Sequence, residues 1–76
     1  MDLQGLLNDA FILAAPYLSK LVFIQGKLEM LSNFDDVKQL LLYIEQAEQE
    51  EENIQKQTDW RIFRIKIEQI LEEREK

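Results

Sequence analysis

The sequence feature that most constrains this chain is an acidic run, residues 45–56 (EQAEQEEENIQK), which separates two apolar segments. The run contains no Gly, no Pro and no long apolar stretch, and its residues are mostly good helix formers. Apolar residues lie before it, up to Ile44, and resume after it at Trp60. We therefore expect the run to be the solvated middle of a long helix, which dictates where the apolar segments can pack.

Before the acidic run, apolar residues recur at helical spacing from Leu3 to Leu31. Asp2 can cap the start of this segment, where a negative charge suits the helix dipole. Pro16 interrupts the pattern, because proline lacks a backbone donor and crowds the preceding turn. The apolar stripe keeps its phase beyond the proline, so we expect a kinked helix over about residues 3–31, made of two pieces in near-continuity.

The clearest boundary is the polar segment 32–36 (SNFDD). Ser32 or Asn33 can cap the next helix, and the two aspartates then fall in its first turn. A tight turn here would fold the next helix back on the previous one and form an αα-hairpin.

The second helix is expected over about residues 34–75. Its apolar face rotates along the way, since Trp60 is two residues out of phase with Val37 and Ile44. Either one helix presents different faces at its two ends, or it breaks near residues 58–59, where both side chains are acceptable N-caps. A strand over residues 60–68 is a minor alternative, because part of this segment alternates. The prediction is thus an all-α helical hairpin in one domain, residues 1–76, assembling into a helical bundle.

The length of the chain limits the core that it can form. A chain of 76 residues buries only about 60% of the surface that it exposes when unfolded, so its core adds little net stability. The sequence has no Cys and no His, which excludes a disulfide framework and the usual zinc ligand sets. Association between chains is the remaining stabilising device. We expect a homo-oligomer, with a dimer favoured.

The charge of the chain argues against two classes of partner. Nine Lys and Arg against fifteen Asp and Glu give a net charge of −6, which disfavours direct binding to nucleic acid or to an anionic membrane. The most apolar window, residues 10–24, is too short and too interrupted to span a bilayer. No Lys or Arg precedes Lys20, so the basic region of a signal peptide is missing. We expect a cytoplasmic protein.

The residues needed for common catalytic chemistry are missing. Without His and Cys, the chain lacks the commonest general base and the best nucleophile. Its two glycines, Gly5 and Gly26, form no phosphate-binding loop, and no calcium-loop pattern occurs. We expect neither an enzyme nor a bound cofactor or metal.

The apolar faces exceed what one contact between two helices can cover, which indicates a protein-interaction module such as an adaptor, an assembly factor or a regulator. The candidate binding residues on these faces are Leu40, Leu41, Ile44, Trp60, Phe63, Ile67 and Ile70.

The acidic run suggests an alternative from a different class of function. An array of carboxylates can mimic nucleic-acid phosphates and occupy the basic groove of a DNA- or RNA-binding protein, as a phage-type counter-defence inhibitor does. The candidate residues for this role are Glu45, Glu48, Glu50, Glu51 and Glu52.

One basic and aromatic cluster, residues 60–66 (WRIFRIK), has two interpretations. It could contact nucleic acid or a target peptide. The interpretation that we favour is a core helix whose long cationic side chains cover its apolar edges. Arg64 is then expected to pair with Glu68, four residues further along the helix.

Overall fold

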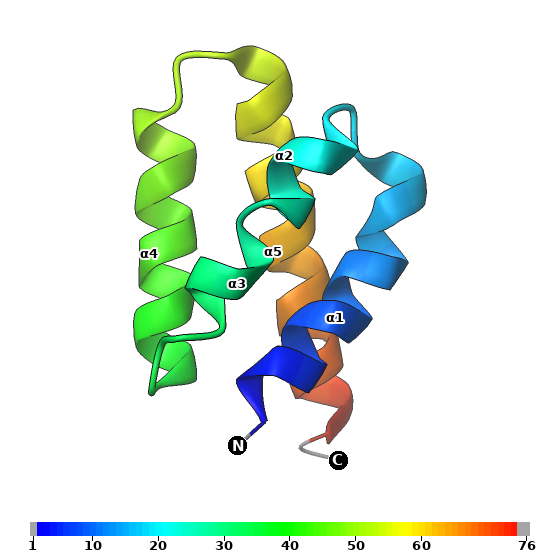
Figure 1. The fold of residues 1–76 in the computed structure, drawn as a ribbon, viewed down its shortest axis with the longest axis vertical. Helices are drawn as coiled ribbons and strands as arrows, with labels where there is room; N and C mark the ends of the chain where they lie inside the picture. The colour runs from blue at the N-terminus through cyan, green and yellow to red at the C-terminus, as the bar shows by residue number, and fades with distance from the viewer. Residues whose placement is uncertain (1, 75–76) are drawn as a thin grey trace.

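The helices of residues 2–74, the part of the chain that the computed structural model describes, pack into a bundle (Figure 1). The predicted all-α class is confirmed, and residues 2–74 contain no strand, so the strand interpretation of residues 60–68 is wrong. In chain order the elements are α1 (Leu3–Ala14), a 3-10 turn η1 (Ala15–Tyr17), α2 (Leu21–Gln25), α3 (Leu28–Leu31), α4 (Val37–Glu50) and α5 (Ile54–Arg74).

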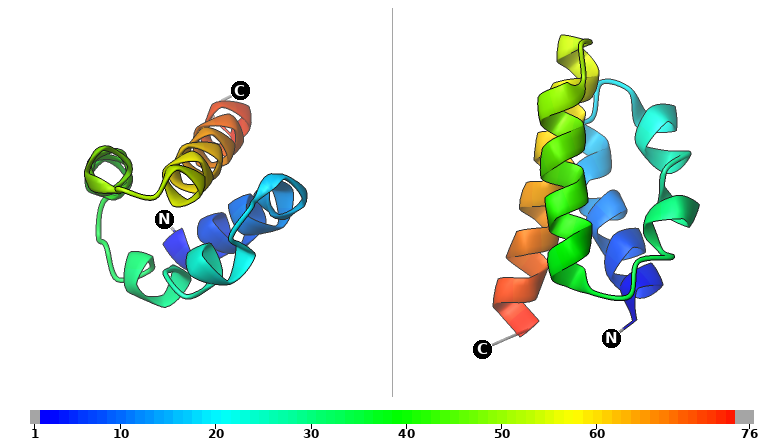
Figure 2. Two further views of the ribbon diagram at one scale, coloured as in Figure 1. Left: turned by 90° about the horizontal axis from the view of Figure 1, so that it is seen from above. Right: turned by 90° about the vertical axis from the view of Figure 1, so that its left-hand side faces the viewer.

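The longest helix, α5, lies between α1 and α4 and runs antiparallel to both (Figure 1). Its most extensive contacts are with these two helices. The short helices α2 and α3 connect the end of α1 to the start of α4 and cover one side of the bundle (Figure 2). No other helix of residues 2–74 lies against the outer side of the α1 and α5 pair (Figure 2).

The core is formed by apolar side chains that recur every three or four residues on the long helices, as amphipathic helices require. The three long helices α1, α4 and α5 all contribute, together with one residue each from α2 and α3. The buried residues are Leu3, Leu6, Leu7, Ala10, Ala14, Ile24, Leu31, Leu40, Ile44, Trp60, Phe63, Ile67 and Ile70.

The start of α1 follows the prediction, but its continuation does not. The Asp2 carboxylate accepts a hydrogen bond from the backbone N–H of Gly5 at 3.0 Å, which confirms the predicted cap. The predicted near-continuity from residue 3 to residue 31 is wrong, because α1 ends at Ala14 and Leu18 is extended, with ψ of 134°. Pro16 accounts for the end of α1, since it cannot donate the next helical hydrogen bond. The chain then reverses direction into α2.

The cap of α4 lies later than predicted. Asp36, rather than Ser32 or Asn33, is the N-cap, and its carboxylate accepts a hydrogen bond from the N–H of Lys38 at 2.9 Å. The Ser32 hydroxyl donates instead to the carbonyl of Glu29 at 2.7 Å, at the end of α3. Asp36 is the N-cap because its backbone is extended and it directly precedes Val37, the first helical residue.

The acidic run is a break between two helices, and not the middle of one. The predicted continuous helix over residues 34–75 is wrong, and so is the alternative break near residues 58–59. Helix α4 ends at Glu50, and α5 begins at Ile54. The Asn53 side chain accepts a hydrogen bond from the N–H of Lys56 at 3.0 Å and so caps α5. Glu48 and Glu50 lie at the negative end of the α4 dipole, which is unfavourable, so the dipole does not account for the end of α4.

The two residues predicted as a possible cap at the break have other roles within α5. The Thr58 hydroxyl donates to the carbonyl of Ile54 at 3.0 Å, inside the helix. Asp59 is fully buried, and its two carboxylate oxygens accept hydrogen bonds from the backbone N–H groups of Ser19 at 2.8 Å and Lys20 at 2.6 Å. Asp59 therefore anchors the chain reversal that precedes α2.

Replacing Asp59 by Ala should lower the free energy of unfolding by about 2 kcal/mol, because two backbone donors lose their charged acceptor. Urea unfolding followed by the fluorescence of Trp60, the only tryptophan and a buried one, measures the change. The control is Asp35→Ala, which removes an exposed carboxylate and should stay within about 0.5 kcal/mol of the parent. Equal stabilities for the two variants would contradict an anchoring role for Asp59.

Candidate interaction surface

The apolar residues predicted to bind a partner lie mainly inside the protein. They come together where α4 and α5 face each other and the rest of the core, and there they are occupied by intramolecular packing. In this conformation a partner cannot reach the buried ones. Leu40, Ile44, Trp60, Phe63, Ile67 and Ile70 are buried, and Leu41 is half-buried at the edge of the core.

Trp60 is the centre of an aromatic cluster that joins three helices. Its ring lies edge-on to Phe23 of α2, with 5.5 Å between ring centroids, and edge-on to Tyr43 of α4 at 6.4 Å. Tyr43 in turn lies 5.3 Å from Phe34. Such edge-on pairs are favourable beyond their burial. Trp60 thus holds α2 and α4 against α5.

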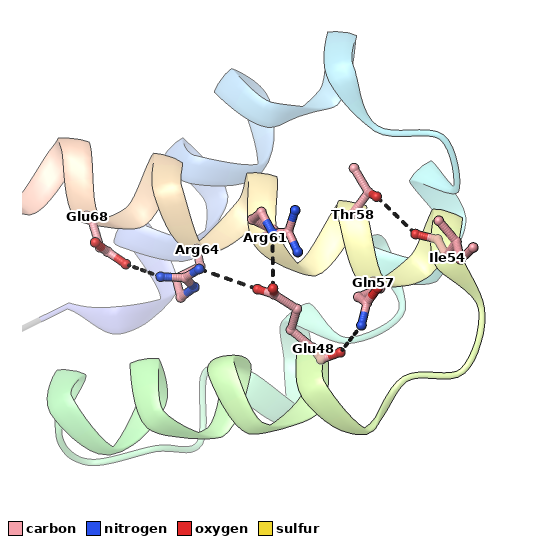
Figure 3. A network of polar contacts seen from close by, with 7 residues as sticks. All are labelled: Glu48, Ile54, Gln57, Thr58, Arg61, Arg64 and Glu68. Carbon is pink, nitrogen blue, oxygen red and sulfur yellow. Dashed lines mark hydrogen bonds and ion pairs between the residues drawn. The ribbon is translucent and has the colours of Figure 1, made fainter.

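The basic side chains of residues 60–66 face two different neighbours. Arg61 and Arg64 both donate to the Glu48 carboxylate of α4, at 3.0 and 3.4 Å (Figure 3). Arg64 also donates to Glu68 at 3.1 Å, which confirms the predicted local pair. Lys66 lies on the other side of α5, with its ammonium 5.1 Å from the centroid of the Tyr17 ring.

Glu48 is the centre of a polar clamp between α4 and α5 (Figure 3). Its side chain is only 12% exposed, and it accepts from both arginines. Its backbone carbonyl also accepts from the side-chain amide of Gln57 at 3.2 Å. The clamp fixes the two helices just below the break between them.

The other acidic residues proposed as a surface array are distributed around the end of α4 and the following turn. Glu45, Glu50 and Glu52 are exposed. Glu50 accepts a hydrogen bond from the Gln46 side chain at 3.3 Å, and half-buried Glu51 accepts from the N–H of Asn53 at 3.2 Å. With Glu48 bound to two arginines, the five carboxylates do not form one continuous exposed array.

A different set of apolar side chains is exposed, and it lies along the seam between α1 and α5. Ile12 is 68% exposed, Leu13 49%, Tyr17 64% and Ile65 40%. Two hollows follow one another along this seam. One is lined by Ile12, Leu13 and Ile70 with the charged residues Asp9, Glu73 and Arg74. The other is lined by Tyr17, Ile62, Ile65 and the stem of Lys66.

We call this surface the α1–α5 face and define it by exposed Ile12, Leu13, Tyr17 and Ile65 and half-buried Ile62, with the buried side chain of Ile70 at the bottom of one hollow. An ion pair between Asp9 and Arg74, with 3.2 Å between carboxylate and guanidinium, closes one end of the seam. No residue of α2 or α3 lines either hollow of this face.

The sequence contained part of the signal for this face. Ile62 and Ile65 widen the apolar stripe of α5 beyond a narrow seam, and Ile12 and Leu13 lie beside the stripe of α1. Apolar periodicity led us to predict the residues on the stripes as the binding residues. Those residues fill the core, and the residues beside the stripes remain at the surface.

Comparison of the chain with known protein families, with characterised proteins and with solved structures found no match. None of the helices within residues 2–74 is both long enough and apolar enough to cross a membrane.

Replacing Glu48 by Gln should destabilise the protein by about 1 kcal/mol, because two arginines lose a largely buried ionic partner. Urea unfolding at low salt measures this loss, and part of it should persist at high salt because the carboxylate is shielded from solvent. The matched control is Glu45→Gln on the exposed side of α4, which should change stability little. If both variants behave alike, Glu48 is not a clamp.

Proposed function

We propose that this protein is a small helical protein-interaction module, such as an adaptor, an assembly factor or a regulator, and that it acts through the α1–α5 face. The single observation that carries the proposal is the set of exposed apolar side chains, Ile12, Leu13, Tyr17 and Ile65, that line two hollows between the α1–η1 segment and α5. Proteins that stay monomeric rarely expose a large contiguous apolar patch, whereas interaction sites often do so with a polar border.

The position of the face distinguishes it from ordinary exposed apolar residues. Single apolar side chains at a surface are normal and need no explanation. Leu42 of α4 and Val22 of α2 are examples, since they are 64% and 76% exposed but line neither hollow of the α1–α5 face. Ile12 and Leu13, in contrast, share a hollow with Ile70 of a neighbouring helix.

The chemical character of the face suits a protein partner. Its centre is aliphatic and aromatic, and its ends carry charged groups, an arrangement typical of the apolar core and polar rim of a protein–protein interface. Tyr17 combines a large apolar ring with a hydroxyl, and tyrosine is enriched at such interfaces.

The alternative, an inhibitor that mimics nucleic acid, receives less support from the geometry. A mimic needs carboxylates that are free to meet a basic groove, but Glu48 is already bound to Arg61 and Arg64. If the acidic surface were nevertheless the binding site, affinity would fall steeply as salt rises, whereas binding through the α1–α5 face should depend weakly on salt.

A photoreactive amino acid placed at Leu13 should form a covalent adduct with a protein, because this position is at the centre of the α1–α5 face. The variant is irradiated in extract of the native source, and the adducts are identified by mass spectrometry. The matched control carries the same photoreactive residue at Leu42, which is more exposed than Leu13 but lies on α4.

Two outcomes are decisive for this experiment. A specific adduct at position 13 that is absent at position 42 would support the proposal, whether the captured protein is foreign or a second copy of this chain. Equal capture at both positions, or no capture at position 13, would contradict it.

A further inference from the structure

The two ends of the α1–α5 face carry opposite charges. At one end Lys66 lies over the ring of Tyr17. At the other end lie Asp9, Glu73 and Arg74, of which Asp9 and Arg74 pair with each other at 3.2 Å. Within residues 2–74 no ion pair neutralises Glu73, so its carboxylate is the excess charge of that end. One end is therefore positive, and the other is negative.

The spacing of these opposite charges makes the face complementary to the same face of a second copy. Lys66 and Glu73 are seven residues apart on α5, which places them on the same side of the helix and about 10 Å apart along its axis. The point midway between them is level with Ile70, which shares a hollow with Leu13. Consider a two-fold axis through this point that lies in the plane of the face and is perpendicular to the seam. It places the positive end of one copy opposite the negative end of the other, and the apolar centres of the two copies opposite each other.

We infer that a second copy of this chain covers the α1–α5 face in this two-fold arrangement. The inference rests on the proposed function and names its partner. In the dimer, α1 and α5 of both copies form a four-helix arrangement, with Lys66 of each copy near Glu73 of the other and the Leu13 side chains close to the axis. A two-fold interface of this kind uses the same patch on both chains, so each contact occurs twice.

The size of the protein adds a separate reason for self-association. A chain of 76 residues has a thin core, and neither disulfides nor histidine ligands are present in its sequence to reinforce it. Packing the α1–α5 seam against its copy buries a second apolar layer outside the existing core. Four-helix packing of antiparallel neighbours is a common way to bury such a layer.

Sedimentation equilibrium of the full chain tests the inference directly. At protein concentrations up to about 100 µM, the expected mass is twice the 9.1 kDa of one chain. Leu13→Glu should give a monomer, since it places two like charges near the axis. Leu42→Glu, a matched change on α4, should leave the dimer intact. Circular dichroism and the emission of Trp60 establish that each variant is folded.

A charge exchange tests the register. Lys66→Glu should weaken dimerisation by about ten-fold, because two attractive contacts become repulsive. Adding Glu73→Lys in the same chain should restore most of the affinity, since each contact is then attractive with reversed sign. A double variant that is no better than Lys66→Glu alone would overturn the two-fold arrangement.

The failure of this inference can be distinguished from the failure of the proposed function. A parent protein that stays monomeric at about 100 µM overturns the inference. The proposed function then stands if the photoreactive residue at position 13 captures a foreign protein. If that residue captures nothing, the proposed function fails as well.

Discussion

The rest of the structure depends on the two hydrogen bonds that the Asp59 carboxylate accepts from the backbone N–H groups of Ser19 and Lys20. A buried carboxylate is tolerated only where donors replace the water that it loses, and here the donors come from a segment about forty residues away in the chain. These bonds hold the reversal after α1 against the second turn of α5. The reversal in turn sends α2 and α3 across the bundle, where Phe23 meets Trp60 and the core residue Ile24 is buried.

The features that could be predicted from the sequence are those decided by near neighbours. The helical class follows from apolar spacing, the cap by Asp2 from one residue type at one position, and the Arg64–Glu68 pair from a separation of four residues. The reversal after Pro16 and the break before Asn53 could not be placed in this way. The first depends on a distant carboxylate. The break before α5 could be placed at any of several residues that are N-caps of similar strength. Asn53 caps α5, whereas the Asp59 side chain binds the backbone of Ser19 and Lys20.

The candidate site illustrates a different limit of periodicity. The stripes through Leu40 and Ile44 and through Phe63 and Ile67 are real apolar faces, but a stripe does not say whether its partner belongs to the same chain. Here α5 packs mainly against α1 and α4, and the apolar stripe that contains Phe63 and Ile67 is buried between these two helices. What remains for a partner are the residues beside the stripes, above all Leu13 and Ile65, whose exposure becomes evident only when the helices are packed.

The position of α5 between α1 and α4 also determines when the core can form. Helix α1 packs mainly against α5, and the Asp9–Arg74 ion pair joins residues that are 65 positions apart. Contacts between segments so distant in sequence carry a high loop-closure cost and slow folding. During synthesis the apolar side of α1, with Leu6 and Leu7, stays largely exposed to solvent until α5 has been made. Helix α1 is therefore made before α5, its main packing partner, and its apolar side is buried only after α5 has followed.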